Sequence, residues 1–369
     1  MTLASRPSPR TDYSMRKWVF DDTPGKYEID LSRSYIDGGR LSELTLPPDL
    51  ELGYGADRGT EPLREQIASL YKGHADSVLV THGAQEALAL AYSTLLRPGD
   101  QVVTFRPGWQ QSWDAPDLMG CQVEAIDLDQ DLGIDLAAVA ERVSSRLRMI
   151  VVNSPCNPTG RRARRAELDA LLRTVTEHDG YLLLDQNYEP DLSTSAAIDS
   201  DRVISVSGLS KIYGFPGLRV GWMYGAPEIV QACAEHKHLT SIANSVLCEV
   251  LACDVLSRSE HYLSKYRREV SAGIDILTRW SAQHQDTLRL TPPEETPFGW
   301  FQLLDGSDSM SFCRQALEQG VLLMPAETLG GVSGFRVGVA IPPAELSEGL
   351  RRIDYILANQ HDFERRTTG

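Results

Sequence analysis

The sequence lacks any long apolar run. None of its 369 residues lie in a stretch approaching the ~18 apolar residues of a membrane span. The opening string, MTLASRPSPRTDYSMRK, has no apolar core of the kind that defines a secretory signal peptide. These absences argue against a membrane or secreted protein, and we expect a soluble, cytoplasmic one.

Cysteine is scarce and positive charge is in deficit. The six cysteines are scattered, with no C-x-x-C pair and no regular framework, so we expect reduced thiols. The net charge of −15 and the pI near 5.0 exclude nucleic acid and anionic membrane surfaces as favoured partners, because the field would repel both. His236 and His238 lie two apart in a helical pattern and do not share a face, so we predict no metal site.

The composition, 42% hydrophobic and 24% charged, is typical of a globular protein, and the length suits about two domains. From about Ser77, short apolar runs alternate with longer amphipathic stretches. This alternation favours an α/β fold with a mostly parallel sheet of about seven strands, covered on both faces. The predicted strands are 77–81, 101–105, 121–127, 148–153, 181–185, 202–207 and 218–225, with helices at 84–96 and 165–178.

The pattern becomes almost purely helical between about 226 and 279. Strand signals return at 298–304 and 334–340, before a closing helical stretch. We therefore predict a smaller α+β domain after the large one. The predicted parts are an N-terminal arm, 1–45, which joins the small domain, a ligand-binding large domain, 46–255, and a small C-terminal domain, 256–369.

Four predicted strands end in chemically capable residues, and open α/β sheets bind ligands at this carboxyl edge. One of these strands leads through a small-residue turn to Lys211, with Gly214, Gly217 and Arg219 following. A partly desolvated lysine there has a lowered pKa and can attack an aldehyde. Small residues permit close approach of a ligand, and a second cation suits a phosphate. The alternative is an ordinary surface lysine.

The other three strand ends each allow two interpretations. Gly83-Ala84-Gln85 opens a helix directly after a strand, so its free amides either bind a phosphate or form a simple turn. Asp185 is a helix cap, a metal ligand or a buried carboxylate that keeps a pyridine nitrogen protonated. Asn157, in N-P-T-G, either binds a ligand or shapes a turn.

Together these strings resemble a known group of enzymes. SPCNPTG, LLLDQNY and SGLSKIYGFPGLRVG, with THGAQEAL upstream and GFRVGVA downstream, are similar to the fold type I pyridoxal 5′-phosphate (PLP) enzymes of the aspartate aminotransferase-like class I/II group. The resemblance covers about residues 50–355. It implies PLP as cofactor, an amino acid as substrate and a homodimer with shared active sites.

The resemblance also implies a role for each position. Lys211 would form the Schiff base with PLP and then move the Cα proton of the substrate. Asp185 would pair with the pyridinium nitrogen, while Asn157 and Tyr188 would bind the ring hydroxyl. Residues on the ring face and at the phosphate would complete the cofactor site: Trp109, Gly83, Ala84, Gln85, Ser210 and Arg219.

Two of the implied roles have a structural alternative, and a third involves the neighbouring subunit. Trp109 is either the ring-stacking aromatic or a core tryptophan. Arg336 would bind the substrate α-carboxylate as a bidentate pair, or else form a structural ion pair. Tyr54 would reach the phosphate of the neighbouring subunit.

Fold and cofactor do not fix the reaction. Transaminases of the group usually carry an L-x-x-G-x-P-type string, whereas residues 29–39 read IDLSRSYIDGG. With THGAQEAL and GLSKIYGFPGLRVGW, this chain more closely resembles the capreomycidine synthase-like branch, which dehydrates a hydroxylated arginine and closes a guanidine-containing ring. In that interpretation Asp30, Ser32, Ser34 or Asp37 contacts the guanidinium or the leaving hydroxyl, or is a solvated loop residue.

We therefore expect Cα deprotonation followed by side-chain elimination and cyclisation of a hydroxylated, arginine-type substrate in natural-product biosynthesis. The alternative is an ordinary aminotransferase that exchanges an amino group between an amino acid and a 2-keto acid. A third hypothesis, a PLP-binding regulator fused to a DNA-binding module, lacks support because no basic helix-turn-helix segment precedes residue 50.

Overall fold

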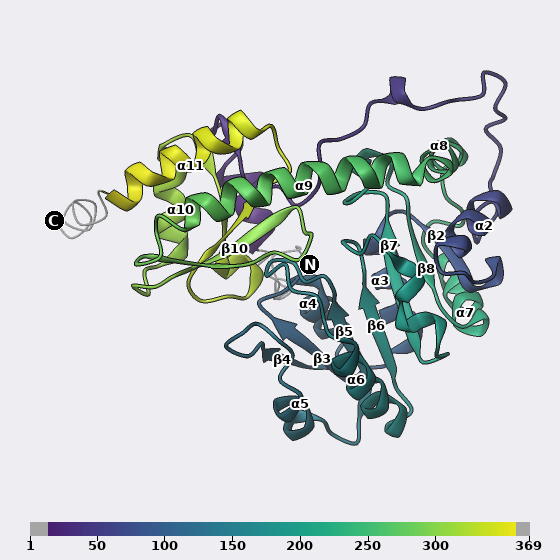
Figure 1. The fold of residues 1–369 in the computed structure, drawn as a ribbon. Helices are drawn as coiled ribbons and strands as arrows, with labels where there is room; N and C mark the ends of the chain where they lie inside the picture. The colour runs from purple at the N-terminus through teal and green to yellow at the C-terminus, as the bar shows by residue number, and fades with distance from the viewer. Residues whose placement is uncertain (1–13, 359–369) are drawn as a thin grey trace, which may run out of the picture.

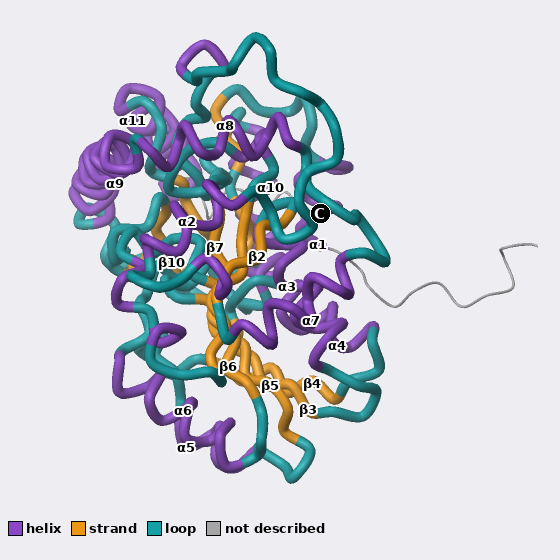
Figure 2. The backbone as a smooth tube through the Cα atoms, turned by 90° about the vertical axis from the view of Figure 1, so that its right-hand side faces the viewer, coloured by secondary structure: helices purple, strands orange, loops and turns teal. Residues whose placement is uncertain are grey.

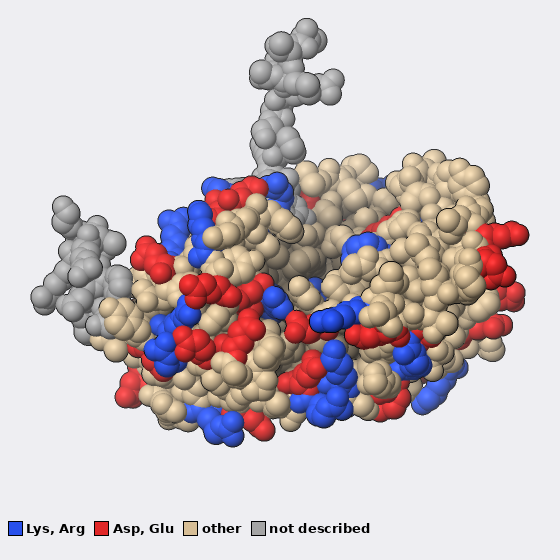
Figure 3. All heavy atoms as spheres, turned by 90° about the horizontal axis from the view of Figure 1, so that it is seen from above, with Lys and Arg blue, Asp and Glu red and all other residues tan. Residues whose placement is uncertain are grey.

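The computed structural model describes residues 14–358 of the chain. Figure 1 shows two lobes, one built on the central sheet and one on a smaller sheet, with the long helix α9 (Ser259–Ser281) running across both. Seen from above, the surface is hollowed between the lobes (Figure 3). No helix within residues 14–358 is long and apolar enough to cross a membrane.

The central sheet has seven strands in the order β2-β8-β7-β6-β5-β3-β4. Only β8 runs antiparallel to its neighbours β2 and β7, and the other pairs are parallel. The predicted α/β fold with a mostly parallel sheet is therefore confirmed. The strands are β2 (Val78–Thr81), β3 (Gln101–Arg106), β4 (Gln122–Asp127), β5 (Leu147–Asn153), β6 (Tyr181–Asp185), β7 (Val203–Gly208) and β8 (Gly221–Tyr224).

Helices cover both faces of this sheet, because successive side chains of each strand point to opposite faces and most are apolar. Figure 2 shows the strands between two helical layers. On one face the apolar core is shared with α3 (Ala84–Leu95), α4 (Gln111–Leu118) and α7 (Pro227–Lys237). On the other it is shared with α2 (Glu61–Leu70), α5 (Leu136–Arg142), α6 (Arg165–Glu177) and α8 (Val246–Ser257).

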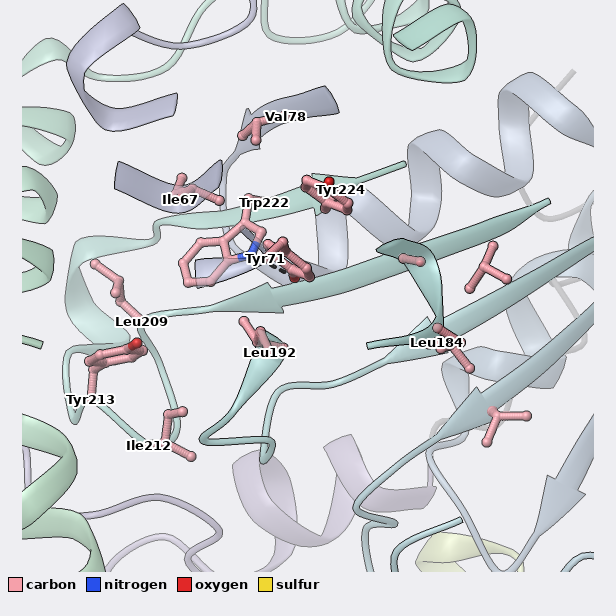
Figure 4. Close-up of a cluster of buried hydrophobic side chains, with 14 of the residues drawn as sticks. Ile67, Tyr71, Val78, Leu184, Leu192, Leu209, Ile212, Tyr213, Trp222 and Tyr224 are labelled. Carbon is pink, nitrogen blue, oxygen red and sulfur yellow. Dashed lines mark hydrogen bonds between the residues drawn. The ribbon is translucent and has the colours of Figure 1, made fainter. Parts of the chain in front are cut away.

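A buried aromatic cluster lies under the segment that carries Lys211 (Figure 4). The Trp222 indole donates to the Tyr71 hydroxyl at 3.1 Å, and the Tyr71 ring stacks on Tyr224 with centroids 4.1 Å apart. Buried polar atoms of aromatic residues need such partners. Leu209, Ile212 and Tyr213 belong to the same apolar core, so the residues around Lys211 are packed against it.

The second lobe has its own apolar core and two small sheets. A four-stranded antiparallel sheet has the order β12-β13-β10-β9, while β1 pairs with β11 in parallel. The elements are β1 (Ile29–Asp30), β9 (Leu288–Thr291), β10 (Phe298–Leu303), β11 (Val321–Leu322), β12 (Met324–Pro325), β13 (Phe335–Gly338), α10 (Ser309–Glu318) and α11 (Pro343–Ala358).

The pairing of β1 with β11 joins the N-terminal segment to the second lobe, and Figure 1 shows the following segment crossing to α2. The domain boundaries at 45 and 255 stay predictions, and residues 1–13 and 359–369 of the predicted parts lie outside the described residues. The short elements are α1 (Ser14–Arg16), a π turn (Lys17–Asp22) and 3-10 turns at Leu41–Glu43, Ala75–Ser77, Leu192–Thr194, Ala196–Ile198, Pro216–Leu218 and Ala326–Leu329.

Candidate active site

A cavity of about 220 Å³ lies at the carboxyl edge of the central sheet. It collects residues from six regions of the sequence, mainly because parallel strands end at the same edge. The predicted site residues that line it are Ala84, Gln85, Trp109, Asn157, Asp185, Tyr188, Ser210, Lys211 and Arg219. Tyr35, Leu88, Asn153, Asn187 and Pro216 line it as well, and were not predicted as site residues.

Lys211 lies three residues beyond the end of β7, and its amine faces the cavity. The Nζ atom donates a hydrogen bond to Ser34 Oγ at 3.3 Å. Burial lowers the pKa of Lys211 to about 8; Arg336 contributes in the same direction and Asp185 opposes it. Lys211 therefore has a larger neutral, nucleophilic fraction near pH 7 than an exposed lysine has.

Gly83, Arg219 and Ser210 form the end of the site that fits a phosphate. Gly83 caps α3 with φ 77°, and a Cβ added there would lie 2.5 Å from Arg219 Nη2. Glycine is therefore required for the guanidinium to pack against this turn. Arg219 Nη1 donates to Ser210 Oγ at 3.4 Å. With the first-turn amides of α3 alongside, a cation, a hydroxyl and a helix N-terminus gather here, which suits a phosphate group.

Asp185 fits the opposite end, where a pyridine nitrogen would bind. Its carboxylate is buried and accepts two hydrogen bonds from Asn187. One comes from the side-chain Nδ2 at 2.6 Å and one from the backbone N–H at 3.2 Å. Burial raises the pKa of Asp185, while the Asn187 bonds and the charge of Lys211 act against that rise. A buried carboxylate with neutral hydrogen-bond partners is stabilised by a protonated ring nitrogen.

Asn153 connects two strand ends at the floor of the cavity. Its Nδ2 donates to the Asp185 carbonyl oxygen at 3.0 Å, and its Oδ1 accepts from the Asn157 N–H at 2.6 Å. The position of Asn157 is thereby tied to that of Asp185. The sequence carried a signal for Asn153, because it ends β5 as Asp185 ends β6.

Trp109 stands at the wall of the cavity and is only half-buried. Its indole Nε1 donates to Gln85 Oε1 at 3.3 Å, next to the α3 turn. An indole held in this way presents aromatic surface to the cavity, as the stacking interpretation requires.

Arg336, on β13 in the second lobe, is hydrogen-bonded to the cavity residue Asn157 but is not itself among the residues that line the cavity. It is 3% exposed, and its Nη1 donates to Asn157 Oδ1 at 2.5 Å while its Nη2 donates to the Ser32 carbonyl oxygen. Its Nε has no hydrogen-bond partner, and no carboxylate among residues 14–358 forms an ion pair with it. Burial lowers the pKa of Arg336 to about 10, against the effect of Tyr188 and Asp30. A buried guanidinium in this state fits a substrate carboxylate.

Tyr188 and Tyr54 differ sharply in position. Tyr188 is buried at the cavity, and burial raises the pKa of its phenol to about 12, so it stays a hydrogen-bond donor. Tyr54 is 91% exposed and does not line the cavity of its own chain. Its role in a neighbouring subunit stays a prediction.

The chain is similar in sequence to known proteins. The family model "Aminotransferase class I and II" matches residues 49–353. Capreomycidine synthase from Streptomyces vinaceus is 29% identical over 325 residues, covering 85% of this chain and 83% of that protein.

Two solved structures are similar over nearly the whole chain. A PLP-dependent aminotransferase from Streptococcus suis has a TM-score of 0.87 and 25% identity, covering 95% of this chain and 98% of that one. The PLP-dependent cyclase OrfR has a TM-score of 0.86 and 26% identity, covering 97% of this chain and 100% of that one.

Proposed function

The chain belongs to the aminotransferase class I and II family, and from this premise we propose what it acts on and how its residues act. It is a PLP-dependent enzyme with an α-amino acid as the expected substrate. The geometry that carries the residue assignments is the meeting of Lys211, Asp185 and the Gly83–Arg219 turn around one cavity.

Bound PLP withdraws electrons from the substrate Cα and so makes its proton removable. Lys211 Nζ is the group that takes this proton, because its pKa of about 8 leaves it partly neutral at physiological pH. Asp185 holds a ring nitrogen in its protonated form, and Arg336 orients the substrate by its carboxylate. Gly83, Ser210 and Arg219 hold the phosphate.

For the reaction, we propose dehydration of a hydroxylated, arginine-type amino acid followed by closure of a guanidine-containing ring. The supporting observation is the similarity to both a capreomycidine synthase and a PLP-dependent cyclase over most of the chain. The segment 29–39 supports it further, because it departs from the transaminase string and contributes Ser32 and Ser34 beside Arg336 and Lys211.

An ordinary aminotransferase is the second candidate. The similarity to the Streptococcus suis enzyme favours it, since that protein matches this chain as well as the cyclase does. In this case a 2-keto acid would accept the amino group, and the same residues would move the Cα proton.

The two reactions are separated by mixing the purified enzyme with single amino acids, arginine and its hydroxylated forms included, without a keto acid. The cyclase predicts many turnovers, loss of water from the product by mass spectrometry and unchanged cofactor absorbance. The aminotransferase predicts one equivalent of keto acid per site and conversion of the cofactor to its amino form. Stoichiometric keto-acid formation would therefore exclude the cyclase.

We also propose a homodimer with shared sites in the cytoplasm. Leu52, Tyr54, Leu239 and Ile242 are exposed apolar side chains, which favours their burial against a second subunit. The six cysteines are all free, which suits a reducing compartment.

A further inference from the structure

The segment after β1 lies against the chain around Lys211. The Ile36 N–H donates to the Lys211 carbonyl oxygen at 3.4 Å, and the Gly39 N–H donates to the Gly214 carbonyl oxygen at 2.7 Å. A Cβ on Gly214 would lie 2.9 Å from Ile36 Cγ1, so the packing is close. The backbone of residues 34–39 is thus held in a fixed position relative to Lys211.

Ser34 points its hydroxyl at the reactive amine. Ser34 is 8% exposed and accepts a hydrogen bond from Lys211 Nζ at 3.3 Å, and its hydroxyl also acts on the nearby Tyr188 phenol by lowering the phenol pKa against the effect of burial. A hydroxyl has one donor and two acceptor positions, so it can serve both partners at once.

The charges around Lys211 do not fix its amine in one place. Asp185 attracts the ammonium form, whereas Arg336 and Arg219 disfavour it. The Tyr35 ring lies 5.9 Å from Nζ, at the outer limit of a cation–π contact, so it attracts the ammonium without fixing its direction. Among residues 14–358, the bond to Ser34 is the hydrogen bond recorded for this amine. A lysine side chain has many rotamers, and a directional bond is what selects one.

We propose that Ser34 is a positioning residue, whose hydroxyl bridges the Lys211 amine and the Tyr188 phenol and holds the free amine at the reacting side of the cavity. The inference rests on the proposed function, because it matters only if Lys211 is the reacting lysine. The bond is accepted from the amine, so it favours the ammonium form. Its removal lowers the pKa of the Lys211 amine and leaves the amine mobile.

The test measures how the full-length protein, freed of cofactor, captures PLP. The rate of appearance of lysine-bound cofactor absorbance is recorded by stopped flow against pH. Only the neutral amine attacks the aldehyde, so the rate rises with pH, and we expect its midpoint in the wild type at the lowered pKa of Lys211, about 8. In Ser34→Ala we expect the midpoint about one pH unit lower, the effect of losing one hydrogen bond from a charged group.

Two further variants separate positioning from packing. Ser34→Cys keeps the volume but bonds weakly, and it should shift the midpoint in the same direction as Ser34→Ala. Ser32→Ala is the matched control, because Ser32 lies in the same segment with 7% exposure but its hydroxyl bonds Asp30. The control should keep the wild-type midpoint.

The outcomes distinguish the inference from the function on which it rests. Wild-type midpoints in both Ser34 variants, or an equal shift in Ser32→Ala, would overturn the role of Ser34 while the Lys211 assignment stands. Capture by Lys211→Ala that equals wild-type capture would instead refute the proposed function itself. With a substrate in hand, Ser34→Ala should lower kcat about tenfold at nearly constant KM, since Ser34 does not contact the carboxylate-binding arginine.

Discussion

Replacing Arg336 by alanine removes the buried cation assigned to the substrate carboxylate. Arg336 is 3% exposed and donates hydrogen bonds to Asn157 Oδ1 and to the Ser32 carbonyl oxygen, while its Nε has no hydrogen-bond partner. Removing one member of a buried, hydrogen-bonded charge pair costs about 3–5 kcal/mol. That loss corresponds to a half-saturating substrate concentration at least about a hundredfold higher.

The assay is a titration of wild-type and variant holoenzyme with amino acids, followed by the change in cofactor absorbance. The half-saturating concentration of Arg336→Lys should lie between those of the wild type and Arg336→Ala, because lysine keeps the charge but loses the planar fork. Binding of the cofactor phosphate should not change, since Arg336 does not contribute to the Gly83–Arg219 turn, whereas the lost bond to Asn157 Oδ1 loosens the ring-hydroxyl end of the cofactor site. A half-saturating concentration in Arg336→Ala equal to the wild type would refute the carboxylate assignment.

The same variant makes a second prediction with a definite sign. The charge of Arg336 lowers the pKa of Lys211, so its removal should raise the midpoint of PLP capture above about 8. This shift is opposite in direction to the shift expected for Ser34→Ala. A lower midpoint in Arg336→Ala would show that burial changes outweigh the lost charge.

The remaining predictions concern Asp185, Tyr54 and Lys237. Asp185→Asn should lose about a hundredfold in turnover and lower the capture midpoint, because the carboxylate raises the pKa of Lys211; wild-type turnover would contradict its role. Tyr54→Ala and Lys211→Ala, each inactive alone, should regain activity when their subunits are mixed, and no regain would exclude shared sites. Lys237 is fully buried and donates to the Val80 carbonyl oxygen at 2.9 Å. Lys237→Ala should therefore lower the free energy of unfolding, measured by urea denaturation, by about 3–5 kcal/mol. A loss below about 1 kcal/mol would contradict this.

The central sheet could be predicted because its strands are buried on both faces. β5, β6 and β7 are near-continuous buried strands rich in apolar residues, and β6 begins and ends at the predicted residues, 181 and 185. The predicted strand 218–225 is shorter in the structure, where β8 covers Gly221–Tyr224. Residues 216–218 form a 3-10 turn and Arg219 takes a left-handed backbone, φ 53°, which directs its guanidinium to Gly83 instead of continuing the strand.

The helical stretch after residue 226 breaks where no glycine or proline marks a break. α7 ends at Lys237 and α8 begins at Val246, with Ile242 at φ 60° between them. Ser245 caps α8 by accepting from the Cys248 N–H, and this signal was present in the sequence. Lys237 is buried because α7 packs beside β2, which a local pattern does not reveal.

The strand-end residues of the site could be recognised, whereas the contribution of the N-terminal segment could not. Ser34 and Lys211 are 177 positions apart, and the two-residue pairing of β1 with β11 that helps to place this segment has no sequence pattern of its own. From the sequence, Ser34 and Ser32 are predicted only as substrate contacts or loop residues. Their bonds to Lys211 and Arg336 follow from tertiary packing.

Borohydride reduction of the holoenzyme followed by peptide mapping tests the central claim most directly. Reduction makes the link between the cofactor and its lysine permanent, so mass spectrometry identifies the modified residue. We predict a single phosphopyridoxyl adduct on Lys211, with none in Lys211→Ala. An adduct on Lys237 or another lysine, or none in the wild type, would contradict the assignment of the site.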